Sequence, residues 1–312
     1  MQKALPYIAI LVSMLIWAAS GIFIQHALVL FRPFTMIMLR FSAAVLLMLA
    51  VGLALKDRST ILGLQRIRKG DVLLFLLAGI LQPVLYYILE TYCYGSISSP
   101  TIAEALLSVG PLIAPLLAWL VLREKVTLFN ILGILISTAG MFMLVLVGSQ
   151  NFDIGQPIGI LFAITAVCSA VMYTIVMKKI PAHYSPLSIV FYGQLTALAF
   201  FIPLWAVIEG RACMEEGWML VHNVPAAMET IGYLSVCSSV IAFILYCYTV
   251  RQIGVTQANA FNNVRPVFTA IIMLIIFGEH LPIGKWMGIL LIVGGLFICQ
   301  YKQTTNHVRL KH

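Results

Sequence analysis

Residues 256–297 read TQANAFNNVRPVFTAIIMLIIFGEHLPIGKWMGILLIVGGLF, and they repeat residues 101–142, TIAEALLSVGPLIAPLLAWLVLREKVTLFNILGILISTAGMF. At a constant offset of 155 (256 − 101), 11 of the 42 positions are identical. Shared leucine or isoleucine carries little weight, because any two apolar helices match. The informative identities are those of proline, glutamate and glycine: Pro111/Pro266, Glu124/Glu279, Gly133/Gly288 and Gly140/Gly295. The pattern indicates an internal duplication.

The composition places this duplicated chain in a membrane. Of its 312 residues, 62% are apolar and only 10% are charged, and the mean hydropathy is +1.02. Soluble globular chains are about 45–50% apolar and about 25% charged. So few charges cannot cover a water-exposed surface of this size. The composition therefore predicts a polytopic membrane protein.

Runs of about 20 apolar residues cross the hydrocarbon layer as helices. The sequence contains ten such runs, and the connections between them are too short for a folded soluble domain. We therefore predict an all-α integral membrane protein with ten transmembrane helices. The predicted spans are about 5–26, 34–55, 72–93, 101–122, 128–148, 158–178, 187–208, 229–250, 255–277 and 284–301.

Each copy of the duplication holds five spans, so the second copy enters the membrane with the opposite polarity. We predict two inverted five-helix repeats, at residues 1–148 and 149–312. With both termini in the cytoplasm, 14 of the 19 Lys and Arg residues lie on the cytoplasmic side, 3 lie outside, and Arg40 and Arg265 lie within spans. This bias follows the positive-inside rule. Anionic lipid on that side accounts for the net charge of +8, so we expect no nucleic-acid partner.

Both copies resemble the EamA module of the drug/metabolite transporter superfamily. The resemblance rests on a helix carrying a proline, a turn with a glutamate and a final helix with spaced glycines. The turn reads G-E in the second copy (FGEHL) and R-E in the first (LREKV). WAASGIF in the first span and LRFSAAVLL in the second are also similar to that family. The resemblance covers nearly the whole chain. It implies a ten-helix permease of the bacterial inner membrane, typically an exporter of amino acids or other small metabolites, with a central cavity.

Arg265 is the strongest functional candidate. It lies ten residues after Val255, or about 15 Å into the span at 1.5 Å per residue. A charge at that depth costs on the order of 3 kcal/mol or more if it faces lipid. Two interpretations remain open: a buried ion pair that fixes helix packing, or a guanidinium that lines the substrate path and grips a carboxylate or phosphate.

Pro266 follows Arg265, and it removes a backbone donor and frees a carbonyl one turn earlier. Asn259, Asn262 and Asn263 lie within two turns and mark one face, where their amides can bind backbone groups or a ligand. Kinked backbone at membrane depth is tolerated where it lines a cavity or is buried in protein. We therefore expect this polar segment to face water and substrate.

The first copy contributes Glu104 and Ser108 to the predicted substrate site, followed by Pro111, which we expect to kink the helix as Pro266 does. Arg40 and Glu90 lie at a depth comparable to that of Glu104. We expect Arg40 to pair with Glu90 or Glu104 in one of two ways: the pair is a structural salt bridge, or its carboxylate exchanges a proton during transport. In the second case, burial would raise the pKa of the carboxylate.

Aromatic and amide side chains within the spans are the remaining candidates. Trp17 lies near the middle of its span, away from the membrane interfaces where tryptophan is common, and small residues flank it. It either packs between helices or lines the cavity. Gln25, Gln82 and Gln194 are weaker candidates of the same kind, and Pro83 predicts a third kink. The repeated glycines predict close helix packing, within the bundle or at a homodimer contact.

The sequence favours a carrier over an enzyme or a pump. It contains no HExxH, no GxSxG and no P-loop. The histidines are dispersed, and the aspartates lie in loops. We therefore expect no catalytic site, metal or cofactor. The predicted function is secondary transport of an amino acid or organic anion by alternating access, with the bilayer and a small-molecule substrate as partners; the alternative is a non-transporting membrane enzyme or assembly factor.

Overall fold

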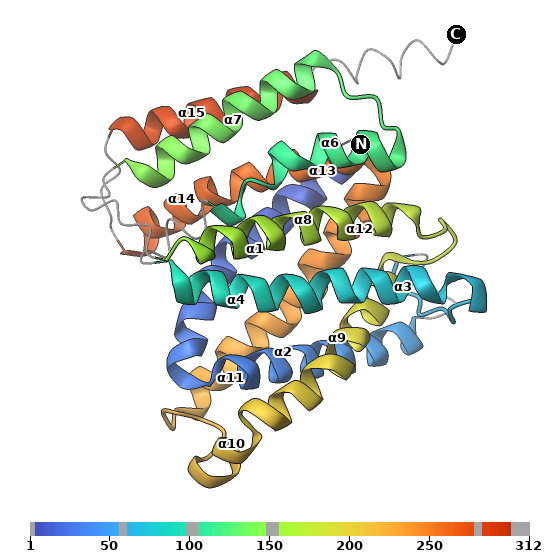
Figure 1. The fold of residues 1–312 in the computed structure, drawn as a ribbon, viewed down its shortest axis with the longest axis vertical. Helices are drawn as coiled ribbons and strands as arrows, with labels where there is room; N and C mark the ends of the chain where they lie inside the picture. Colours follow the sequence, from blue (N-terminus) through green and yellow to red (C-terminus); the bar gives the residue numbers. More distant parts are fainter. Residues whose placement is uncertain (1–3, 56–60, 98–105, 148–155, 278–282, 301–312) are drawn as a thin grey trace. The chain divides into compact units, whose positions relative to one another are not determined.

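The computed structural model describes residues 4–55, 61–97, 106–147, 156–277 and 283–300, and this part of the chain is helical, without a β-strand (Figure 1). Six helices in it are long and apolar enough to cross a membrane. Three shorter apolar helices accompany them: Gly110–Leu122, Leu128–Met143 and Ile283–Cys299. The prediction of an all-helical, multi-pass membrane protein is therefore confirmed, whereas the count of ten spans is not established.

The helices form two compact units. Unit 1 comprises residues 1–85 and 176–249. Within it, α2 packs on α9 and on the wide-turned helix η3, and α1 packs on η3. Its helices are α1 (Leu5–Leu30), α2 (Pro33–Ala54), η1 (Lys69–Asp71), α3 (Val72–Gly79), η2 (Ile80–Leu85), α9 (Pro186–Ile208), α10 (Gly210–Glu216), α11 (Val224–Gly232), η3 (Tyr233–Ile241) and most of α12 (Ala242–Ile253).

Unit 2 comprises residues 86–175 and 250–312. Within it, α7 packs on α15, and α6 packs on α13 and η4. Its helices are α4 (Tyr86–Ser96), α6 (Gly110–Leu122), α7 (Leu128–Leu146), most of α8 (Ile158–Lys179), α13 (Val255–Ala260), η4 (Phe261–Val264), α14 (Arg265–Phe277) and α15 (Ile283–Gln300). Each unit thus draws helices from both predicted halves of the sequence, so the units follow packing and not the sequence repeat.

The boundaries of the helices follow the sequence duplication. Helix α6 begins at residue 110 and α14 begins at residue 265, which are 155 residues apart (265 − 110). In each copy the helix begins one residue before the shared proline, Pro111 or Pro266. The two copies therefore start these helices at equivalent residues, as a duplicated backbone requires.

The duplication extends to an unusual feature of the third span in each half. Residues 80–85 contain a kink, because Gln82 has extended backbone angles just before Pro83. Adding 155 gives residues 235–240, which lie inside the π-helix Tyr233–Ile241. The wide turns of a π-helix are rare in proteins and are frequent at functional sites. The third spans of the two halves thus depart from regular α-helix at aligned positions of the repeat.

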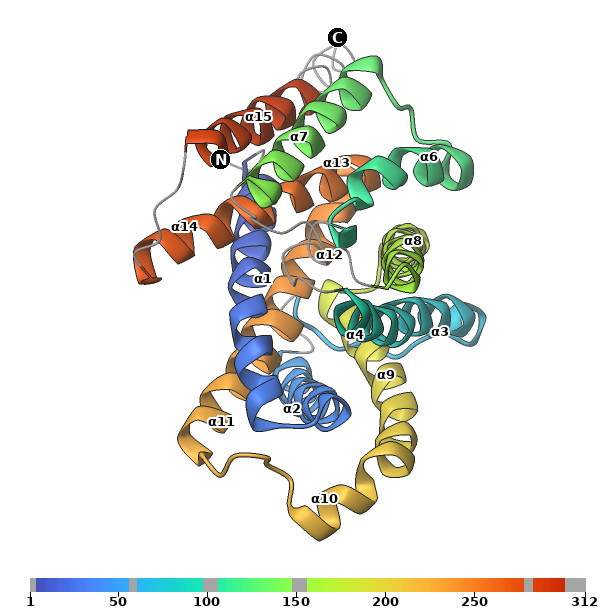
Figure 2. The ribbon, with the colours of Figure 1, turned by 60° about the vertical axis from the view of Figure 1, so that its left-hand side comes forward.

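Helices α7 and α15 lie side by side in unit 2, as both views show (Figure 1, Figure 2). Their backbones meet at the repeated glycines. A Cβ atom on Gly133 would lie 2.4 Å from the backbone nitrogen of Cys299, and one on Gly295 would lie 2.5 Å from the carbonyl oxygen of Gly133. Small residues permit this close approach between membrane helices. The predicted packing role of these glycines is thus realised within one chain.

Residues 68–71, directly before α3, are hydrogen-bonded to Tyr184, which lies just before α9 and outside the spans. The Tyr184 hydroxyl donates to Asp71 Oδ2 (2.8 Å) and accepts from the backbone N–H of Arg68 (2.9 Å). Burial raises the pKa of Tyr184; the Arg68 N–H lowers it and the Asp71 carboxylate raises it. The hydroxyl therefore stays protonated at neutral pH and keeps donating to Asp71.

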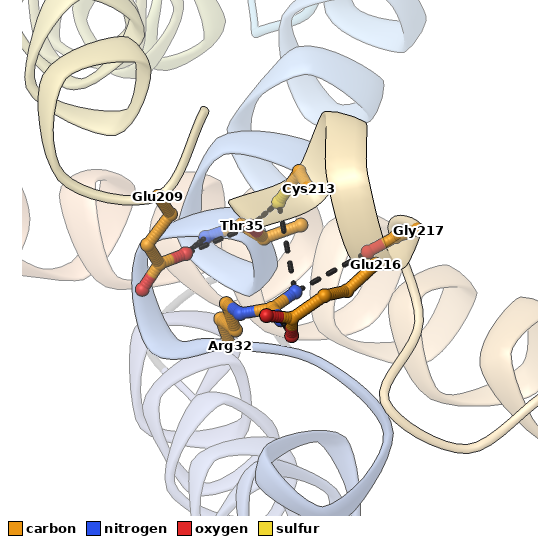
Figure 3. A network of polar contacts seen from close by, with 6 residues as sticks. All are labelled: Arg32, Thr35, Glu209, Cys213, Glu216 and Gly217. Carbon is orange, nitrogen blue, oxygen red and sulfur yellow. Dashed lines mark hydrogen bonds and ion pairs between the residues drawn. The ribbon is translucent and has the colours of Figure 1, made fainter. Parts of the chain in front are cut away.

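A polar network connects α10 to the start of α2 in unit 1 (Figure 3). The buried Glu209 carboxylate accepts hydrogen bonds from the N–H groups of Phe34 (3.0 Å) and Thr35 (2.7 Å) and from Thr35 Oγ1 (2.8 Å). Arg32 pairs with Glu216 and donates to the carbonyl of Gly217. Glu209 thus satisfies donors that the first turn of a helix leaves open, and its charge complements the helix dipole.

Replacing Glu209 with glutamine is expected to lower the stability of the purified protein by about 1–2 kcal/mol, because a neutral amide accepts more weakly at the positive end of α2. Thermal denaturation in detergent, followed by size-exclusion chromatography, measures the change. The matched control is Glu215→Gln on α10, the short helix that follows Glu209, where an exposed pair with Arg211 contributes little. Equal midpoints for both variants would show that Glu209 does not hold α2.

Candidate substrate site

The polar segment around Pro266 interrupts a helix in unit 2. Helix α13 ends at Ala260, residues 261–264 form a 3₁₀ turn, and α14 begins at Arg265. The backbone N–H of Arg265 bonds to the carbonyl of Asn262, three residues back, as in a 3₁₀ helix. Pro266, which has no N–H, follows directly. The backbone is therefore tightened in the turn directly before this proline.

Two of the three asparagines hold this turn in place. Asn263, which is fully buried, donates from Nδ2 to Ser137 Oγ (2.8 Å) and Thr138 Oγ1 (3.1 Å) on α7. Asn259 donates to the carbonyl of Val255 (3.0 Å) within its own helix. Asn262 is only half-buried and donates to Asn259 Oδ1 at the long distance of 3.4 Å. Asn259 and Asn263 thus anchor the turn, and Asn262 has the weakest attachment of the three.

Arg265 is the first residue of α14, and its side chain is half-buried. Its carbonyl accepts a hydrogen bond from Thr269 Oγ1 (3.2 Å), one turn further along. Its guanidinium brings a permanent positive charge and planar, paired donors into the interrupted part of the span. That chemistry suits a carboxylate or phosphate, which such a fork binds through two parallel hydrogen bonds.

The equivalent span of the first half is interrupted beside it. Residues 108–109 form a turn, and α6 begins at Gly110, with Pro111 as its second residue. A Cβ atom on Gly110 would lie 4.0 Å from Asn259 Oδ1, so the start of α6 lies against α13. Unit 2 therefore brings both helix interruptions together. Paired interruptions of this kind form substrate and ion sites in membrane transporters.

Around these interruptions, several buried polar atoms have no hydrogen-bond partner within the part of the chain that the structure describes. They are Ser108 Oγ, Asn263 Oδ1 and both polar atoms of the Gln257 side chain. Ser108 and Gln257 are each 2% exposed. An unsatisfied buried polar group costs about 1–3 kcal/mol, and structures keep few of them without a reason. The sequence contained no signal for Gln257, because one glutamine among three asparagines looked like part of a polar helix face.

Glu124, one of the residues shared by the two copies, fixes the start of α13. Its carboxylate accepts hydrogen bonds from the N–H groups of Val255 (3.1 Å) and Thr256 (3.4 Å) and from Thr256 Oγ1 (3.2 Å). Gly254, at φ 90°, makes the sharp turn that precedes this helix. The duplicated glutamate is therefore a helix cap in the second half of the chain, and it positions the interrupted helix.

The other predicted site residues are distributed over both units. Trp17 lies in unit 1, where its Nε1 donates to the carbonyl of Ser238 (3.2 Å) and its ring packs on Phe243 and Tyr246. Glu90 is half-buried on α4 in unit 2, whereas Arg40 is buried in unit 1. Glu104 lies outside the described residues. The proposed pairing of Arg40 with a glutamate therefore stays a prediction.

Comparisons with known proteins bear on the family of this chain. The model of the EamA-like transporter family matches residues 4–146 and 157–300. The uncharacterized transporter YetK of Bacillus subtilis (strain 168) is 26% identical over 246 residues, which are 77% of this chain and 72% of that protein. The uncharacterized inner membrane transporter YicL of Salmonella typhimurium (strain LT2) is 24% identical over 297 residues, 93% of each protein.

Two further matches bear on function and on fold. A probable terminal-alkyne amino-acid exporter of Streptantibioticus cattleyicolor is 25% identical over 234 residues, which are 73% of this chain and 74% of that protein. One solved crystal structure superposes with a TM-score of 0.76 at 17% identity, covering 94% of this chain and 98% of that one. At that identity the structural match establishes the fold alone.

Proposed function

Because this chain belongs to the EamA-like transporter family, we propose that it is a secondary transporter that exports a small carboxylate-bearing metabolite, an amino acid or an organic anion. It works by alternating access in the bacterial inner membrane, with both termini in the cytoplasm. One observation carries the proposal for the substrate: Arg265 is the first residue of α14, at a helix interruption that packs against the start of α6.

The substrate carboxylate binds the guanidinium of Arg265 in this proposal. Asn262, whose only hydrogen bond described here is long, is free to turn its amide toward the substrate, while Asn259 and Asn263 hold the turn. The relative named as an amino-acid exporter supports the choice of substrate class. Glu90, which is half-buried on α4, is the proposed carboxylate that gains and loses a proton during transport.

Transport by the purified protein tests the proposal. The protein is reconstituted into liposomes loaded with a panel of unlabelled amino acids and small organic acids, and uptake of the matching labelled compound is measured. We expect at least one compound to enter faster than in protein-free liposomes and to saturate with concentration, as a carrier with a binding site requires. If no compound moves above the protein-free rate, with or without a pH gradient, the chain is no carrier of these substrates.

A further inference from the structure

Three cationic residues follow one another closely in unit 1, on the segment that joins α2 to α3. Arg66, Arg68 and Lys69 are all exposed. Within the residues that the structure describes, none of these three side chains takes part in a hydrogen bond or an ion pair. Like charges repel one another, so three unpaired cations within four residues favour an anion from outside the chain.

Hydrogen bonds to α9 and to the residue before it fix the backbone that carries these cations. Gln65, directly before Arg66, donates from its backbone N–H to Ser188 Oγ (2.9 Å). The backbone N–H of Arg68 donates to the Tyr184 hydroxyl (2.9 Å). Arg66 thus lies between two anchored residues. Because this backbone is already ordered, it loses little conformational entropy when a ligand binds.

The cations lie at the polar end of a candidate membrane span, which begins at Lys69 and runs to Cys93. Leu73, one helical turn after Lys69, is 66% exposed, and Leu76 on the same face is 43% exposed. Exposed leucines on a membrane span contact the acyl chains of lipids, which are equally apolar. The cations are therefore placed at the level of the lipid headgroups, directly beyond a lipid-facing side of α3.

The single acidic residue among residues 61–73 does not cancel this charge. Asp71 is half-buried, and its Oδ2 accepts the hydrogen bond of the Tyr184 hydroxyl (2.8 Å). With three positive charges and one negative charge, the segment has a net charge of +2 (3 − 1). A net positive charge attracts an anionic headgroup and gains much less from a zwitterionic one, which carries its own ammonium group.

We propose that residues 66–69 bind the headgroup phosphate of an anionic phospholipid, with an acyl chain along Leu73 and Leu76 of α3. Arginine side chains hold a phosphate through paired hydrogen bonds, and lysine adds a point charge. A soluble anion could use the same cations, but it would leave the adjacent leucines uncovered. A lipid covers both parts of this surface at once. The site uses none of the residues proposed for substrate binding and does not depend on what the chain transports.

Native mass spectrometry of the purified, delipidated full-length protein measures the binding. The probes are phosphatidylglycerol and phosphatidylcholine with identical acyl chains. We expect the first phosphatidylglycerol to bind about 30-fold more tightly than the first phosphatidylcholine, because the segment has two net charges. Glycerol 3-phosphate has the anionic group without acyl chains, and it should not displace phosphatidylglycerol at equal concentration. Equal affinities for the two lipids, or displacement by glycerol 3-phosphate, would overturn the proposal.

Two double variants with the same loss of charge assign the binding to this segment. Arg68→Gln/Lys69→Gln removes two exposed charges but keeps the backbone hydrogen bond of residue 68. It should bind phosphatidylglycerol about 30-fold more weakly, at the unchanged affinity for phosphatidylcholine. The control Lys125→Gln/Arg211→Gln removes two exposed charges elsewhere and should bind both lipids as the wild type does. If the two variants bind phosphatidylglycerol equally, residues 66–69 are not the lipid site.

Discussion

Replacing Arg265 with leucine is expected to weaken the transport of a carboxylate substrate by about 30-fold or more, seen as a higher KM or as lost flux. Removing one partner of a buried, hydrogen-bonded charge pair costs about 2–5 kcal/mol, and 1.4 kcal/mol is a factor of ten. Leucine keeps the apolar volume of the side-chain stem. The measurement is initial-rate uptake in proteoliposomes over a range of substrate concentrations.

Arg211→Leu is the matched control for this experiment. It removes the same charge from an exposed position on α10, where the side chain is 89% accessible and pairs only with Glu215 among the contacts described. It should transport normally. A folded Arg265→Leu protein with an unchanged KM for its carboxylate substrate would show that the guanidinium at Arg265 has a structural role.

Replacing Gly295 with alanine is expected to destabilise the protein by about 1–3 kcal/mol or more, because the α7 backbone lies where the new methyl group must go. That methyl group would stand 2.5 Å from both the carbonyl oxygen of Gly133 and the backbone nitrogen of Ser137. No flexible side chain can move aside. Helices α7 and α15 must separate, and the purified protein should aggregate at a lower temperature in detergent.

The adjacent Gly294 provides the control in the same helix. A methyl group there would meet no heavy atom within 4 Å. Both substitutions gain the same helix propensity, up to about 1 kcal/mol for alanine over glycine, so the difference between them isolates the helix contact. Gly294→Ala should match or exceed the wild type in stability. If both variants denature at the same temperature, α7 and α15 do not pack through Gly295.

The sequence duplication predicted more of the backbone than the hydropathy pattern did. Proline, glycine and glutamate occur at matched positions because each imposes a local geometry, so the restart of α6 at residue 110 and of α14 at residue 265 followed from them. Hydropathy predicted unbroken spans, since it cannot detect where a helix widens or tightens. The π-helix at residues 233–241 was missed for that reason.

Side-chain partners were the part that the sequence could not supply. Asn263 looked like a substrate ligand, yet its amide holds Ser137 and Thr138, which lie more than a hundred residues away in the chain. The same applies to Glu124: the duplication marked it as a shared turn residue, but its contacts with α13 could not be read from the sequence. Such pairings depend on which helices pack together, and no local pattern encodes that.

The same limit explains why the hydrogen bonds of Arg40 to Ser239 and Ser238 were not predicted. The sequence suggested only a carboxylate partner for Arg40, because charge is visible in a sequence and packing is not. Ser238 and Ser239 lie about 200 residues further along the chain, and two serines in an apolar span look like small packing residues. Their alignment with Arg40 results from the contact between α2 and the π-helix.

The central claim is that the guanidinium of Arg265 lines the substrate path. Restoring a positive charge chemically at residue 265 tests this claim most directly. Arg265→Cys is made in a variant whose six native cysteines are replaced by serine or alanine, and the proteoliposomes are treated with aminoethyl or sulfonatoethyl methanethiosulfonate. If Arg265 lines an aqueous substrate path, the cationic reagent reacts and recovers part of the carboxylate transport, whereas the anionic reagent does not. A thiol that neither reagent reaches, or transport that the added cation fails to recover, would contradict the claim.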